Sequence, residues 1–243
     1  MIGWFYMNAP KAVTRDQTTG CPTDGPTALH FVIIDTTDTL PEPAQKQVIT
    51  RILSLARSLG TQRGDLLELR TINLSKPAGN VIFSRCSPGD GSEESDLTGN
   101  PAHAKKRWAE EFFDPLNKLV TENNSSKEAD HSPLLEMFQA LAVERIEPLS
   151  QPNRPVDLLV ISDMRQYTDA YSHYTGDLGY QRFRESTVYN KLHTNLGNAS
   201  LAILYVQRSM PKINERAHIE FWNEWASDNG ASLISVERLQ GEN

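Results

Sequence analysis

Two runs of apolar residues, each ending in an aspartate, restrict the fold of this chain more than any other feature. Residues 28–35 read ALHFVIID, and residues 156–164 read VDLLVISDM. Nearly continuous apolar runs of this length are typical of strands buried on both faces of a mostly parallel sheet. A third run, SLAILYVQR at residues 200–208, has the same character. These runs predict an α/β protein with a parallel sheet at its centre.

Segments with helical spacing of apolar residues alternate with these strands. The first occupies residues 41–60, with prolines at its start and Gly60 at its end, as expected for helix termini. Further helices are predicted at 105–122, at 132–146 with Ser132 as N-cap and Pro133 in the first turn, at 181–194 and at 212–230. Further strands are predicted at 65–73, 80–87 and 231–239.

Strands that alternate with helices in this way predict one doubly wound domain, with helices on both faces of its sheet. We expect this domain to span residues 28–243, after an extended N-terminal arm of residues 1–27 that is rich in Thr, Pro, Gly and Asp. Residues 87–100 are acidic and full of turn formers, so they are expected to form a surface loop.

The composition of the chain indicates which kinds of binding partner and which cellular compartment to expect. The net charge of -7 and a pI near 5.4 disfavour binding to nucleic acid or to anionic lipid, which need clustered Lys and Arg. No apolar stretch is long enough for a membrane span or a signal core, so a cytoplasmic location is expected unless an upstream signal or anchor has been removed. Cys21 and Cys86 are isolated in the sequence, and reduced thiols are the expectation.

The ends of the buried strands carry the residues with candidate chemistry. Asp35 opens the stretch Asp-Thr-Thr-Asp-Thr, which has the form D-x-T-x-T, and Asp163 ends the strand LLVIS. Ligands of open α/β sheets bind outside the carboxyl ends of the strands. The D-x-T-x-T stretch resembles the D-x-S-x-S metal-ion-dependent adhesion motif of von Willebrand factor A (vWA) domains. Ser132 and Asp163 stand where that family has the later arms of its metal site.

This resemblance covers residues 28–240 and implies a doubly wound vWA-like fold with a Mg²⁺ (or Mn²⁺) site. The implied metal ligands are Asp35, Thr37, Thr39, Ser132 and Asp163, with the two aspartates acting mostly through water. Mg²⁺ favours six oxygen ligands in an octahedron. Residues Asp38 and Arg165, beside these positions, are expected to face a partner. The S-P helix opening, the I-S-D-M strand end and the F-W-x-x-W segment also resemble a bacterial subgroup of such domains.

The implied function is a non-enzymatic protein-binding or scaffolding module, with an unidentified protein partner and no small-molecule cofactor. Two departures from the motif bear on this function. Threonines replace both usual serines, and Asp38 adds a carboxylate beside the site. A more negative site binds a cation more tightly and an acidic ligand less well.

An enzyme is the alternative interpretation of the same residues. The stretch IIDTTDTL also has the outline of the haloacid-dehalogenase nucleophile motif, in which Asp35 would attack a phosphoryl group held by Mg²⁺. Phosphatases of that class have a second aspartate where Thr37 stands, and the hairpin insert expected after the motif is missing. Capping roles for Asp35 and Asp163 at the strand ends are the third interpretation.

Two further features are expected to be structural. His30 lies inside the first strand and is predicted to be a core or sheet-face residue. Phe221, Trp222 and Trp225 share one helix face, which is expected to pack on the sheet.

Overall fold

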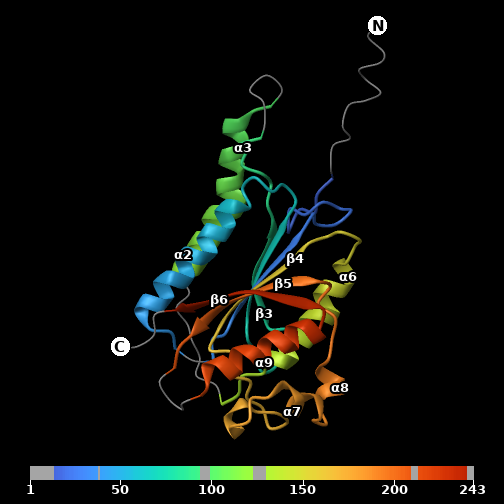
Figure 1. The fold of residues 1–243 in the computed structure, drawn as a ribbon. Coiled ribbons are helices and arrows are strands. Elements are labelled where there is room, and N and C mark those ends of the chain that lie inside the picture. Colours follow the sequence, from blue (N-terminus) through green and yellow to red (C-terminus); the bar gives the residue numbers. More distant parts are fainter. Residues whose placement is uncertain (1–13, 38, 94–98, 123–129, 209–212, 240–243) are drawn as a thin grey trace.

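A six-stranded sheet forms the centre of the computed structural model, which describes residues 14–37, 39–93, 99–122, 130–208 and 213–239 (Figure 1). The strands lie in the order β3-β2-β1-β4-β5-β6, with β3 antiparallel and the other neighbours parallel. Their bounds are β1 Leu29–Ile34, β2 Leu66–Thr71, β3 Asn80–Cys86, β4 Val156–Ser162, β5 Ala199–Val206 and β6 Ala231–Leu239. The predicted α/β class and mostly parallel sheet are confirmed.

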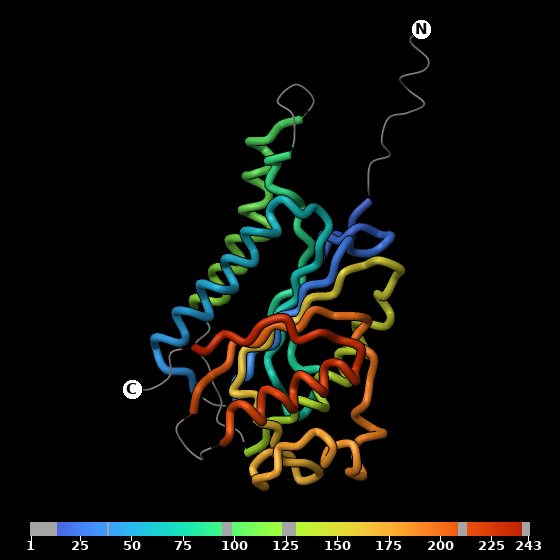
Figure 2. Tube along the Cα trace, viewed as in Figure 1, coloured from blue at the N-terminus to red at the C-terminus, as the bar shows by residue number. Residues whose placement is uncertain are grey.

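Helices cover both faces of the sheet, as the alternating pattern predicted. On one face lie α2, α3 and α4, and on the other lie α5, α7, α8 and α9 (Figure 2). The bounds are α2 Glu42–Ser58, α3 Pro101–Trp108, α4 Asp114–Glu122, α5 Leu134–Leu141, α6 Glu147–Leu149, α7 Tyr180–Arg184, α8 Tyr189–Leu192 and α9 Glu215–Asp228. Two hydrophobic clusters, one on each face, result from this layering.

Two of the predicted helices contain a π-helical turn shortly before a proline. The segment Ala109–Phe113 precedes Pro115, and Ala142–Ile146 precedes Pro148. A proline inside a helix lacks an N–H donor and clashes with the carbonyl four residues earlier. A wider turn relieves that clash and keeps the helix axis continuous.

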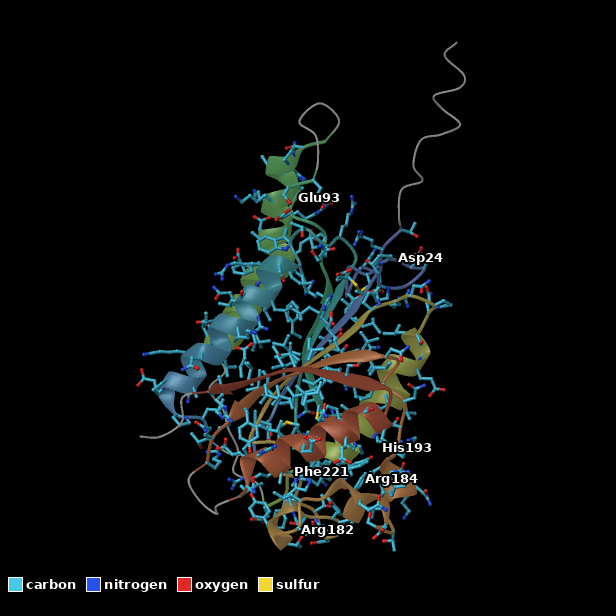
Figure 3. The ribbon with its side chains drawn as sticks, viewed as in Figure 1. Asp24, Glu93, Arg182, Arg184, His193 and Phe221 are labelled. Atoms are coloured by element: carbon cyan, nitrogen blue, oxygen red, sulfur yellow. A yellow bond between two sulfur atoms is a disulfide. The ribbon has the colours of Figure 1, made fainter. Side chains whose placement is uncertain are left out.

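The helix predicted at residues 181–194 is instead two short helices, α7 and α8, joined by residues 185–188. The predicted aromatic face of α9 is confirmed, since Phe221, Trp222 and Trp225 are at most 1% exposed. Phe221 packs edge-on against Phe183 of α7, and Figure 3 shows it on α9, beside the segment that carries Arg182 and Arg184.

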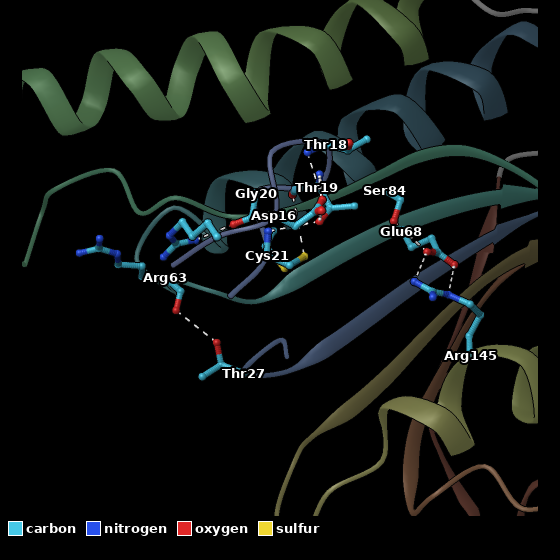
Figure 4. Close-up of a disulfide and its surroundings, with 12 residues drawn as sticks. Asp16, Thr18, Thr19, Gly20, Cys21, Thr27, Arg63, Glu68, Ser84 and Arg145 are labelled. Atoms are coloured by element: carbon cyan, nitrogen blue, oxygen red, sulfur yellow. Dashed lines mark hydrogen bonds and ion pairs between the residues drawn. A yellow bond between two sulfur atoms is a disulfide. The ribbon is translucent and has the colours of Figure 1, made fainter. Parts of the chain in front are cut away.

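A disulfide joins Cys21 to Cys86, so the expectation of reduced thiols was wrong. The bond ties the N-terminal segment to the end of β3 (Figure 4). Asp16 organises the turn before Cys21 by accepting hydrogen bonds from the backbone N–H groups of Thr18 and Thr19. Residues 14–27 are therefore a folded turn linked covalently to the sheet.

The first part of the acidic stretch 87–100 is buried, which corrects the prediction of a surface loop for that part. Ser87 is fully buried and donates its hydroxyl hydrogen bond to the carbonyl of Leu59. Gly91 is also buried and lies so close to Ala104 that a Cβ would be 2.7 Å from that side chain. Residues 94–98 lie outside the described residues.

Candidate functional site

The carboxyl ends of β1 and β4 bring the two strand-end aspartates to one edge of the sheet. The two strands pair in parallel, with Ile34 beside Ile161, and the backbone N–H of Asp35 donates to the carbonyl of Ile161. The strand order reverses its direction between β1 and β4, which is where doubly wound sheets form their ligand sites. We call the group of Asp35, Thr37, Ser132, Ser162 and Asp163 the edge cluster.

Asp35 is the centre of the edge cluster and is 8% exposed. One carboxylate oxygen, Oδ1, accepts from the backbone N–H of Thr37 at 3.0 Å and from its hydroxyl at 2.6 Å. The other, Oδ2, accepts from the hydroxyl of Ser162 at 2.7 Å and from that of Ser132 at 3.2 Å. Three segments that are distant in the sequence therefore meet on one buried carboxylate.

Ser132 takes part in the edge cluster and does not cap a helix, which corrects the predicted N-cap. Helix α5 begins after Pro133, and its N-cap residue makes no side-chain hydrogen bond. The side chain of Gln166 instead accepts from the backbone N–H of Leu135 at 2.9 Å. The Ser132 hydroxyl is thereby available to Asp35.

Asp163 is the second carboxylate of the edge cluster, and it lies beside two arginines. Its Oδ1 accepts from the backbone N–H of Arg165 at 3.0 Å. Its Oδ2 lies 3.7 Å from Nε of Arg165 and 3.8 Å from Nε of Arg208. Burial raises the pKa of Asp163 to about 6, with a further contribution from the charge of Asp35, while the Arg165 hydrogen bond and the two arginine charges oppose the increase.

The remaining predicted site residues have different placements. Thr39 is exposed, and its carbonyl accepts from Nη1 of Arg208 at 3.2 Å. Arg165, predicted to face a partner, is only 4% exposed and lines a cavity of about 330 Å³ beside the edge cluster. That cavity is also lined by His173, Tyr174, Asp177 and Asn214. Asp38 lies outside the described residues.

Two residues of this region were missed from the sequence. Ser162 directly precedes Asp163, and a hydroxyl at the end of a buried strand was the signal that could have identified it. Arg208 is the last residue of the third apolar run and lies two residues after the end of β5, so its position at the same sheet edge could have been expected. Neither residue belongs to the D-x-T-x-T motif from which the site was predicted.

The edge cluster does not fit a divalent cation while both arginines stay in place. Among the residues that the structure describes, no three His, Cys, Asp or Glu side chains form a group that could hold a metal. A divalent ion about 5 Å from one guanidinium would be repelled by on the order of 7 kcal/mol at an effective dielectric constant near 20. Two such repulsions offset the attraction of the two described carboxylates, Asp35 and Asp163, at similar distances. The electrostatic free energy that Mg²⁺ gains at this site would therefore be too small to offset the loss of its waters of hydration.

A different charged cluster lies at the amino edge of the sheet. The ring of His30 lies between two aspartates, with Nε2 3.2 Å from Asp65 and Nδ1 3.0 Å from Asp157. Burial would lower the pKa of His30, but the hydrogen bonds to Asp157 and Asp65, together with their charges, raise it to about 9. The predicted sheet-face histidine is therefore protonated at neutral pH.

Stability is expected to fall between pH 6.5 and 9 because of His30. The folded state holds this proton more tightly than the unfolded state, so the stabilisation is complete below pH 6.5 and is lost as the pH rises through about 9. The loss should be on the order of 1–3 kcal/mol. Urea unfolding of wild type and His30→Gln across this range measures it, with His103→Gln, a change at an exposed histidine of α3, as the control. An equal slope in wild type and His30→Gln would contradict this assignment.

The fold and the edge cluster together define a doubly wound α/β protein with a polar site at its topological switch point. The chain matches no protein-family model and no curated protein. Among solved structures, it is similar to VWA2, a paralogue of ArnB from Sulfolobus acidocaldarius, with 11% identity and a TM-score of 0.41. That match covers 96% of this chain and 44% of the other, so the chain spans less than half the length of VWA2.

A second similar structure is an aerotolerance-related membrane protein from Bacteroides fragilis, at 10% identity and a TM-score of 0.39, with 88% of this chain and 92% of the other covered. None of the helices in the described part of this chain has the length and apolar character needed to span a bilayer.

Proposed function

We propose that this chain is a non-enzymatic protein-binding or scaffolding module that recognises its partner at the carboxyl edge of the sheet. The observation that carries the proposal is the edge cluster, in which one buried carboxylate joins β1, β4 and the entry to α5. Such a network fixes its loops in one arrangement, and a fixed surface lowers the entropic cost of binding. The neighbouring cavity offers space for a side chain of the partner.

The phosphohydrolase alternative gains no support from the geometry of Asp35. A nucleophilic carboxylate needs one oxygen that can reach the phosphorus atom. Both oxygens of Asp35 already accept hydrogen bonds. The shortest bond to Oδ1 is 2.6 Å and the shortest bond to Oδ2 is 2.7 Å. We expect no stable adduct with beryllium fluoride and no hydrolysis of phosphoesters.

Magnesium or manganese at Asp35, Thr37, Thr39, Ser132 and Asp163 stays a prediction from the motif. Binding there would require Arg208 to move away from Asp163 and Thr39. The compartment is a separate proposal: the Cys21–Cys86 disulfide favours an oxidising environment over the cytoplasm that the sequence suggested.

Substitution of Asp35 by asparagine tests the proposed site. An asparagine has one acceptor oxygen, so either Ser132 and Ser162 together or Thr37 lose their acceptor. The free energy of unfolding should therefore fall by about 1–3 kcal/mol while the protein stays folded. Partner capture from the native cell should weaken by about tenfold or more. Asp24→Asn is the matched control, because Asp24 is exposed and lies far from the α7–α9 end of the molecule in Figure 3. Equal capture by a folded Asp35→Asn protein would exclude the edge cluster as the binding site.

A further inference from the structure

Arg208 connects the two loops that would have to hold a metal ion. It follows β5, donates from Nη1 to the carbonyl of Thr39, and places Nε 3.8 Å from Oδ2 of Asp163. Thr39 follows β1, and Asp163 directly follows β4. A positive group of the chain itself thus bridges two of the segments that carry predicted metal ligands.

Arg165 holds Arg208 in this position. Its side chain is 5% exposed, its Nε lies 3.7 Å from the same oxygen of Asp163, and its Nη2 approaches the backbone carbonyl of Arg208 at 3.4 Å. Its guanidinium also lies over the ring of Tyr174, 5.9 Å from the centroid. These contacts hold the Arg165 side chain against Asp163 and Tyr174 and position the backbone of Arg208.

Two cations of the chain itself lie at the carboxylates of the edge cluster, while Asp38, the third carboxylate of this region, lies outside the described residues. Two carboxylates, Asp35 and Asp163, lie with two guanidiniums, Arg165 and Arg208. A guanidinium keeps its charge at every physiological pH and donates in a fixed fork. It can therefore serve permanently as the counter-ion of a buried carboxylate, whereas a metal ion would exchange with solvent.

We propose that Arg208 is the resident cation of the edge cluster, with Arg165 as its positioning residue, and that the site works without a divalent ion. This inference rests on the proposed function, because it concerns the chemistry of the same binding edge. It predicts that divalent ions bind weakly to the wild type and that removal of the Arg208 charge opens a position for them.

Titration with Mn²⁺, followed by the electron paramagnetic resonance signal of the free ion, tests the inference in the whole chain. Wild type should bind Mn²⁺ only in the millimolar range, and Arg208→Gln should bind about tenfold or more tightly, since a repulsive charge is gone. Arg208→Lys keeps the charge and should behave as wild type. Arg238→Gln, which changes an exposed arginine paired with Glu215, is the matched control.

Circular dichroism melting of each variant confirms that it is folded, and Arg208→Ala replaces Arg208→Gln if that variant is not. Micromolar binding by wild type, with no gain in Arg208→Gln, would overturn the inference, because the metal would then bind beside the arginine. Absence of binding in both proteins up to about 10 mM would overturn the claim that Arg208 holds the cation position. Either result leaves the partner-capture test with Asp35→Asn unaffected, so the two proposals can fail separately.

Discussion

Replacement of Glu68 by alanine is expected to destabilise the protein by about 3–5 kcal/mol. Glu68 lies on β2, is 1% exposed, and accepts from Nε of Arg70 at 2.7 Å and from Nη2 of Arg145 at 2.8 Å. The hydroxyl of Ser84 on β3 donates to the same carboxylate at 2.8 Å, and Figure 4 shows Glu68 between Ser84 and Arg145. Alanine would leave the guanidinium of Arg70, which is 4% exposed, without its carboxylate.

The same reasoning provides the controls for Glu68. Glu110→Ala removes one partner of the exposed pair with Lys106, and it should change the free energy of unfolding by less than about 1 kcal/mol. The double variant Glu68→Met/Arg70→Met removes both buried charges and should recover part of the loss, because no charge of that pair then remains desolvated. Urea unfolding measures all three. A loss below 1 kcal/mol in Glu68→Ala would mean that water reaches Arg70.

Most of the fold followed from patterns that depend on the backbone and on burial. Continuous apolar runs identified β1, β4 and β5, and alternation with helices identified the parallel sheet. The carboxyl ends of neighbouring parallel strands must meet at one edge, which is why Asp35 and Asp163 could be placed together. The strands β2 and β3 were also predicted, and the structure pairs them antiparallel.

Long-range pairing of side chains could not be obtained in the same way. Glu68 and Arg70 alternate with leucines on one face of β2, a pattern typical of a strand with a solvent-facing side. The structure buries that polar face, and Arg145 from 77 residues away supplies the second cation for Glu68. Ser162 and Arg208 similarly acquire their roles only through contacts across the sheet edge. Local spacing contains no information about such partners.

The disulfide is the clearest case, because Cys21 and Cys86 are separated by 65 residues and neither belongs to a paired motif. Their bond depends on the N-terminal segment returning to the end of β3. The backbone N–H of Cys86 donates to the carbonyl of Thr19, and the Thr27 hydroxyl donates to the carbonyl of Arg63. These contacts bring the two cysteines together only in the folded state.

Removal of this disulfide by Cys21→Ala/Cys86→Ala is expected to lower the free energy of unfolding by about 2–4 kcal/mol. A cross-link over 65 residues restricts the unfolded chain strongly, and the chain-entropy relation gives a value of about 4 kcal/mol for a loop of this length. The lower end of the range applies if the turn of residues 14–27 separates from the sheet once it is no longer held. Guanidinium unfolding of wild type, with and without a reductant, and of the double variant measures the effect.

Two comparisons make this result decisive. The reductant should destabilise wild type to the level of the double variant. It should leave the double variant unchanged, because Cys21 and Cys86 are the two cysteines of the chain and both are replaced in this variant. Mass spectrometry after alkylation of protein from the native cell should show Cys21 and Cys86 blocked from the reagent. If both thiols react in the native protein, and if the reductant does not alter its unfolding, the bond does not form in the cell. The proposal of an oxidising compartment would then fail, whereas the edge cluster and its test with Asp35→Asn would stand, since neither depends on the bond.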